Sequence, residues 1–180
     1  MISNYDYRWC NLGQSFKVCF GTCPQLSAHG INGKALAEVF CDWSEEQAYQ
    51  AVREFLAGQE AAGIEGVISN NDAMALGALK ALRERGYNLE PYRAEGLYVP
   101  ILGIDGDDEV LELVRDGFMV GTALQDPQQY AQVTLDLIES LTSGSEFDAQ
   151  KEGVELGDNG QIIIPFIKIG PKEAALLKPR

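Results

Sequence analysis

Apolar and polar positions along residues 36–144 follow two alternating periods, which predict strands separated by helices. Nearly continuous apolar runs suit buried strands. Such runs occupy residues 67–69, 99–104 and 118–124, and a weaker one occupies residues 36–41. Between them, apolar residues recur at the three- and four-residue spacing of a helix face. This alternation predicts an α/β fold in which helices cover both faces of a parallel sheet.

The helix expected after residues 67–69 has recognisable ends. Its apolar face is formed by Ala75, Ala78, Leu79 and Leu82. Asn71 or Asp72 can cap its first turn by accepting from free backbone N–H groups. Gly86 follows a basic last turn, as is usual at a helix C-terminus. Residues 70–72 therefore lie at the carboxyl end of a strand, where open α/β sheets bind ligands.

Cap residues mark two more helices. Ser44 and Gln47 form a capping box before one helix. Asp126 and Pro127 begin another, which Gly144 stops. The apolar stripe of that last helix comprises Tyr130, Val133, Thr134, Leu137, Ile138 and Leu141.

The C-terminal segment predicts a hairpin. The runs 154–156 and 161–169 flank the turn residues 157–160. Pro165 lies inside the second run and predicts an edge strand or a crossover between lobes. A short helix over residues 172–177 is expected to close the chain.

Residues 1–35 differ from the rest of the chain. Residues 15–20 can form one strand, but glycines and Pro24 interrupt any long helix around it. We therefore divide the chain into an N-terminal stretch, 1–35, and one α/β domain, 36–180.

Composition excludes several classes of protein. The net charge of −13 over 180 residues argues against a nucleic-acid partner. No apolar run is long enough to cross a membrane, and no signal peptide is visible at the start. The cysteines are Cys10, Cys19, Cys23 and Cys41. The spacing of Cys19 and Cys23 permits a metal pair, but no second pair follows and His29 is the only histidine, so we favour incidental thiols over a zinc site.

Three motifs resemble those of type I periplasmic binding proteins. They are residues 69–77 (SNNDAMALG), 103–105 (GID) and 121–127 (GTALQDP), in that order along the chain. Within that family the similarity is greatest to the galactose/glucose-binding proteins of bacterial ABC transporters, and it runs from about residue 36 to the C-terminus. The resemblance implies one lobe of a two-lobed fold, with returning segments, present as a fragment because a complete member has another lobe before this point.

Four side chains directly follow predicted strands, namely Trp43, Asn71, Asp105 and Gln125. In galactose/glucose-binding proteins the matching positions hold a stacking Trp, an Asn, an Asp and an Asn, all on the sugar. The resemblance therefore implies a monosaccharide site. Each residue alone also has an ordinary structural explanation: a core Trp, a helix-capping Asn, an Asp in a turn and a solvated Gln.

The resemblance also implies a role for Glu65, because the family has an acidic calcium ligand at this position. The oxygen-rich loop that completes such a site has no counterpart here. We therefore expect no tight calcium site and no cofactor. We also expect no enzymatic activity, since the sequence contains no nucleophile elbow, Walker loop or dinucleotide fingerprint.

The favoured hypothesis is the substrate-binding component of an ABC sugar transporter, periplasmic or at the cell surface, with a membrane permease as its partner. Self-association through the helix that starts at Asp126 is a further expectation. The alternative hypothesis is the effector-binding domain of a lactose-repressor-family regulator, which shares the fold. A third hypothesis is a small α/β enzyme. Genes for a permease and an ATPase beside this one would favour the first, and a regulated operon the second.

Overall fold

The computed structural model describes residues 15–18, 36–58, 64–92 and 96–177. Its main feature is a six-stranded sheet with the order β2-β1-β3-β4-β5-β8. The strands are β1 (Ser15–Val18), β2 (Ala37–Phe40), β3 (Val67–Ser69), β4 (Ile101–Asp105), β5 (Gly121–Leu124) and β8 (Ile167–Ile169). β3, β4 and β5 are parallel, whereas β1 and β8 pair antiparallel with their neighbours. The sheet is therefore mixed, with the predicted parallel strands at its centre.

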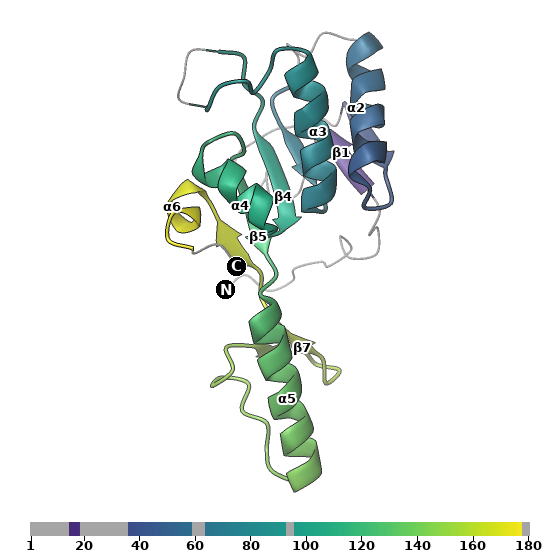
Figure 1. The fold of residues 1–180 in the computed structure, drawn as a ribbon. Coiled ribbons are helices and arrows are strands. Elements are labelled where there is room, and N and C mark those ends of the chain that lie inside the picture. The colour runs from purple at the N-terminus through teal and green to yellow at the C-terminus, as the bar shows by residue number, and fades with distance from the viewer. Residues whose placement is uncertain (1–14, 19–35, 59–63, 93–95, 178–180) are drawn as a thin grey trace.

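Three helices lie side by side on one face of this sheet (Figure 1). They are α2 (Glu45–Gly58), α3 (Asp72–Glu84) and α4 (Asp108–Arg115). Each connects one strand to the next in the same direction across the sheet, and right-handed crossovers then place all three on one side. The sequence predicts helices on both faces, so the described helices differ from that expectation.

Burial along the strands agrees with this one-sided arrangement. Val67, Ile101 and Leu124 point toward the helices and are buried. On the opposite face, Leu102 is 41% exposed and its neighbour Ile68 is only half-buried. The core thus lies between the central strands and the helices. Its largest fully buried side chains include Met74, Leu79, Leu82, Ile101, Val110 and Val114.

α2 and α3 pack closely because Gly77 has no side chain. A Cβ at Gly77 would lie 2.2 Å from the Glu45 carbonyl oxygen. The two helices make the most extensive contact between elements among the described residues. Any larger residue at position 77 would force them apart.

The predicted helix ends are confirmed. Asn71 caps α3, and its Oδ1 accepts from the Met74 N–H at 3.0 Å. At the start of α2, Ser44 Oγ accepts from the Gln47 N–H, but the Ser44 N–H donates to the Cys41 carbonyl, so only half of the predicted capping box is formed. Asp126 caps α5 by accepting from Gln128, and Gly144 ends that helix in the left-handed region.

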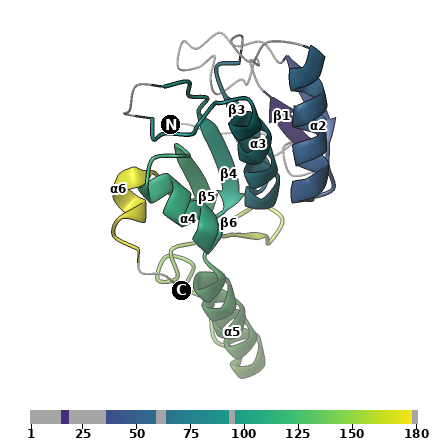
Figure 2. The same cartoon turned by 45° about the horizontal axis from the view of Figure 1, so that its top comes forward.

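α5 (Pro127–Ser143) projects away from the sheet together with a small hairpin, as Figures 1 and 2 show. The hairpin strands are β6 (Glu155–Leu156) and β7 (Ile162–Ile163), joined through the predicted turn. β8 begins after Pro165 and pairs with β5 at the edge of the main sheet. The run interrupted by Pro165 therefore crosses between the two parts, as its sequence predicts. The closing helix α6 spans Pro171–Ala174.

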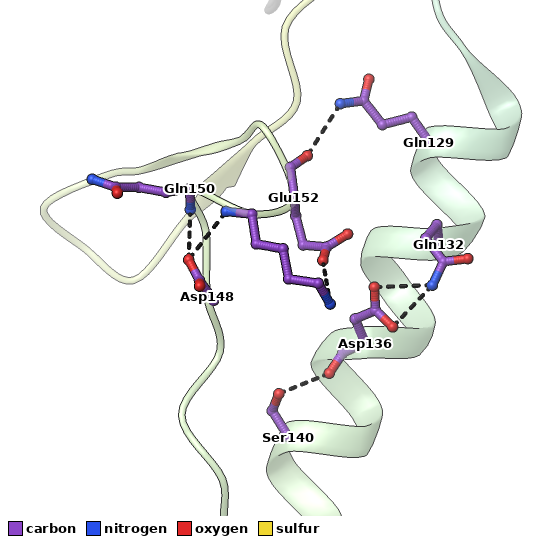
Figure 3. A network of polar contacts seen from close by, with 8 residues as sticks. Gln129, Gln132, Asp136, Ser140, Asp148, Gln150 and Glu152 are labelled. Atoms are coloured by element: carbon purple, nitrogen blue, oxygen red, sulfur yellow. Dashed lines mark hydrogen bonds and ion pairs between the residues drawn. The ribbon is translucent and has the colours of Figure 1, made fainter.

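We call α5 and residues 144–166 the arm. Gln129 Nε2 donates to the Glu152 carbonyl and so joins α5 to the segment that follows it, while Gln132 Nε2 donates to Asp136 within α5 (Figure 3). Of the predicted α5 stripe, Val133 is buried, while Ile138 is 52% and Leu141 74% exposed. Most of the stripe is thus exposed to solvent.

No helix among the described residues combines the length and apolar character needed to cross a lipid bilayer.

Candidate functional site

The carboxyl ends of β2, β3, β4 and β5 meet at one edge of the sheet and carry the four predicted residues. β2 runs in the same direction as β3, because both pair antiparallel with β1 between them. Trp43 lies in the turn after β2, Asn71 after β3, and Asp105 and Gln125 at the ends of β4 and β5. Adjacent strands are about 4.8 Å apart, so β2 lies roughly 10 Å from β3. The structure thus gathers Asn71, Asp105 and Gln125 closely and sets Trp43 to one side.

Asp105 and Gln125 are in direct contact. The Gln125 Nε2 donates to Asp105 Oδ1 at 3.1 Å, and the Gln125 backbone N–H donates to the Asp105 carbonyl at the same distance. Burial raises the pKa of the Asp105 carboxyl, and the negative charge of Asp107 raises it further. The Asp72 backbone N–H also donates to this carboxylate, which opposes the rise in its pKa. A carboxylate has two oxygens with about four lone pairs, so Asp105 can still accept from a ligand.

Asn71 is nearly buried at the start of α3. Its Oδ1 caps the helix, as the simpler explanation predicts. The described residues provide no acceptor for its Nδ2, which can therefore donate to a ligand. Ser69 Oγ donates to the Asn71 carbonyl at 2.7 Å and fixes the turn that presents the amide.

Trp43 is 50% exposed and is not a core residue. Its backbone φ is 56°, and that of the preceding Asp42 is 45°. A bulky residue in the left-handed region is uncommon, and such strain concentrates at functional sites. Asp105 is also strained, with a φ of 122°. Two of the four predicted residues therefore adopt backbone conformations that side chains disfavour.

Asp72, beside Asn71, has a role that sequence reasoning missed. Its buried carboxylate accepts from the Gly106 N–H, the Asp107 N–H and the Thr122 hydroxyl, each at 2.8 Å. Burial raises the pKa of Asp72 to about 6, although the three donors oppose that rise. The signal available in the sequence was that Asp72, Gly103 and Thr122 each belong to one of the three motifs.

Gly103 is needed for that contact. A Cβ at this position would lie 2.0 Å from Asp72 Oδ1. The glycine of the 103–105 motif is therefore explained by the close approach of a carboxylate to the β4 backbone.

The remaining candidates lie elsewhere or outside the described residues. Glu65 is exposed just before β3, at the amino end of the strands and opposite the site. The described residues hold no cluster of three or more His, Cys, Asp or Glu that could bind a metal. Cys41 is buried, which raises the pKa of its thiol. Cys10, Cys19, Cys23 and His29 lie outside the described residues.

A cavity of about 450 Å³ also lies away from this edge, among α2, α3 and α4. It is open to solvent and lined by charged groups of both signs, including Glu45, Lys80 and Arg83. Polar groups that converge at strand ends are the better candidate for a ligand site.

Comparison with known proteins agrees with this architecture. The family model described as periplasmic binding protein domain matches residues 15–146. The match includes β1, which lies N-terminal to the boundary predicted after residue 35, while residues 19–35 lie outside the described residues. That boundary stays a prediction.

Two curated relatives are similar in sequence. The D-galactose/methyl-galactoside binding periplasmic protein MglB of Haemophilus influenzae is 31% identical over 81% of this chain and 40% of its own length. The xylitol-binding protein of Mycolicibacterium smegmatis is 32% identical over 63% of this chain and 30% of its own length. The chain thus spans less than half the length of either relative.

Solved structures share the fold. A Caulobacter myo-inositol binding protein with bound myo-inositol superposes with a TM-score of 0.62 at 21% identity, covering 87% of this chain and 47% of that one. An ABC transporter periplasmic solute binding protein of Actinobacillus succinogenes with bound D-allose superposes with a TM-score of 0.58 at 20% identity, covering 76% of this chain and 40% of that one.

Proposed function

The chain belongs to the periplasmic binding protein domain family, and from this membership we propose that it supplies one wall of a monosaccharide-binding site. The complete protein would be the substrate-binding component of an ABC sugar transporter, delivering its ligand to a membrane permease from the periplasm or cell surface. No catalytic step is part of this proposal.

The convergence of Asn71, Asp105 and Gln125 at adjacent strand ends carries the proposal. A sugar hydroxyl both donates and accepts hydrogen bonds. Nδ2 of Asn71 supplies a donor, and the Asp105 carboxylate supplies a charged acceptor. Bonds to charged groups are about twice as strong as neutral ones, so Asp105 is the principal anchor.

Trp43 would act differently. Its half-exposed ring offers a flat apolar surface beside the polar groups. The C–H face of a pyranose can cover such a surface and remove it from water. The backbones of the strands that carry Trp43 and Asn71 are roughly two strand spacings, about 10 Å, apart, so the Trp43 side chain must extend toward Asn71 for one monosaccharide to touch both.

We favour a hexose such as galactose or glucose. The support is the similarity to the galactose-binding relative, which is 31% identical. Relatives named for xylitol and ribose are also similar in sequence, so the choice among sugars rests on this comparison and on the Trp43 surface.

The affinity of this chain alone should be low. One wall leaves the other side of a sugar in water, so about half of the hydrogen bonds would be missing. Hydrogen bonds to charged groups contribute about 1.5–3 kcal/mol each, and about 1.4 kcal/mol changes the dissociation constant tenfold. We expect millimolar or weaker binding.

Titration with D-galactose, D-glucose and D-ribose, followed by amide NMR, tests the proposal. A sugar that binds should shift the amide signals of Asn71, Asp105 and Gln125, and Asp105→Ala should abolish those shifts. Asp158→Ala is the matched control, because it removes an exposed carboxylate from the arm. Shifts that persist in Asp105→Ala, or an absence of shifts for all three sugars at about 100 mM, would contradict it.

A further inference from the structure

Asp72 connects three elements through one carboxylate. It is the first residue of α3, and it is fully buried. Its Oδ2 accepts from the backbone N–H groups of Gly106 and Asp107, in the turn between β4 and α4, and its Oδ1 from the Thr122 hydroxyl in β5. These partners lie 34, 35 and 50 residues away in sequence.

The two N–H groups that Asp72 holds directly follow Asp105. The backbone of Asp105 has a φ of 122°, which residues with a side chain rarely adopt. Such a conformation persists only when surrounding contacts determine it. The next residue, Gly106, also has a positive φ, of 81°. The turn that aims Asp105 is thus strained and needs an anchor.

Close packing limits the anchor to a short carboxylate. A Cβ at Gly103 would collide with Asp72 Oδ1, and one at Gly106 would lie 2.4 Å from Leu124 Cδ1. The turn therefore rests on β5 on one side and on Asp72 on the other. A side chain longer than Asp at position 72 would displace the turn, because buried space there is already filled.

We infer that Asp72 is a positioning residue, which fixes the Asp105–Gly106–Asp107 turn so that the Asp105 carboxylate faces the ligand edge. The inference rests on the proposed function for its consequence, which is sugar affinity. Asp72 does not touch the ligand, since its oxygens are occupied by Gly106, Asp107 and Thr122.

Three variants of the full chain separate positioning from general stability. Asp72→Ala removes the acceptor, and Asp72→Asn keeps its shape with a weaker, neutral acceptor. Asn88→Gly is the matched control, because Asn88 is an equally buried clamp at the other end of the strands, bonded to Val99 and Phe118. Glycine also tolerates the positive φ of 49° at that position.

The first measurement is amide hydrogen exchange at Gly106 and Asp107, divided by exchange at the core residue Leu82. Asp72→Ala should raise this ratio about tenfold or more, since both amides lose a charged acceptor. Asn88→Gly should leave the ratio unchanged even where it lowers overall stability. An unchanged ratio in Asp72→Ala, or an equal rise in Asn88→Gly, would overturn the inference.

Asp72→Asn keeps the test decisive if Asp72→Ala does not fold. Because an amide oxygen accepts less strongly than a carboxylate, the Gly106 and Asp107 amide protons should move upfield while the Asp105 amide keeps its wild-type dispersion. Unaltered Gly106 and Asp107 shifts would refute the assigned contacts.

The second measurement uses D-galactose and D-glucose. If the wild type binds either sugar, Asp72→Ala should weaken binding about as much as Asp105→Ala, and Asp72→Asn should restore most of it. Wild-type affinity in Asp72→Ala would overturn the inference. If the wild type binds neither sugar, the proposed function fails for them, while the exchange ratio still decides whether Asp72 positions the turn.

Discussion

Gln125 Nε2 donates to Asp105 Oδ1 at 3.1 Å, so two residues 20 positions apart form one polar unit at the ends of β4 and β5. Gln125 is neutral, whereas Asp105 carries a full negative charge. In a protein that contains both lobes, Asp105→Ala should therefore weaken sugar binding more than Gln125→Ala. A difference of about tenfold or more is expected, because bonds to charged groups are about twice as strong. Calorimetry on both variants measures it, and equal losses would contradict the assignment.

Stability should depend on pH through Asp72. Its folded pKa of about 6 lies above the ordinary value of 3.8, so the folded state binds the proton more tightly than the unfolded state. The stabilisation from protonation is thus complete below pH 3.8 and lost as pH rises through about 6. This difference between the folded and ordinary pKa of Asp72 corresponds to roughly 3 kcal/mol of folding free energy.

Urea unfolding of the wild type and Asp72→Asn at pH 4 and pH 7 measures this effect. The wild type should gain stability relative to Asp72→Asn as the pH falls, because the asparagine does not titrate. The raised pKa of Asp105 acts in the same direction in both proteins and cancels. A constant difference between the two proteins would show that Asp72 titrates normally.

Trp43→Ala should have little effect on folding. Half of the Trp43 surface is already exposed, so its truncation should change the free energy of unfolding by less than about 1 kcal/mol. Leu82→Ala, in the core, should cost about 2–5 kcal/mol. Guanidinium unfolding compares the two. A loss of several kcal/mol for Trp43→Ala would make Trp43 a core residue and remove it from the site.

The arm should promote self-association. Ile138 and Leu141 lie exposed on α5, and exposed apolar surface favours contact between molecules. We expect light scattering to show a mass that rises with concentration, more steeply in high salt, because the chain carries a net charge of −13. The double variant Ile138→Glu/Leu141→Glu should remain monomeric, with Thr142→Glu as a control on the same helix. A wild type that stays monomeric at all concentrations would exclude this role.

Calcium should have little effect. Glu65 is exposed, and the described residues contain no cluster of three or more His, Cys, Asp or Glu side chains that could bind a metal. A ligand raises stability only when its concentration exceeds its dissociation constant for the native state. We therefore predict that about 1 mM calcium leaves the melting temperature unchanged, with 1 mM magnesium as control. A rise of several degrees that is lost in Glu65→Gln would establish a calcium site.

The sequence by itself determined the local structure. Asn71, Ser44 and Asp126 cap helices as predicted, because a cap depends only on residues within one helical turn. The central strands follow from their apolar runs, because parallel strands that are buried in a sheet have nearly continuous apolar sequences. The placement of Trp43, Asn71, Asp105 and Gln125 at one sheet edge follows from that alternation of strands and helices.

Only the tertiary structure decided the non-local pairing. β1 enters antiparallel between β2 and β3, and no local pattern specifies such a neighbour. The one-sided placement of α2, α3 and α4 depends on the direction in which successive crossovers proceed. Asp72 reads as a helix-capping residue in the sequence, but its partners come from segments 34 to 50 residues away. Such a contact exists only after the strands have aligned, because burial and register bring Gly106, Asp107 and Thr122 within reach of one carboxylate.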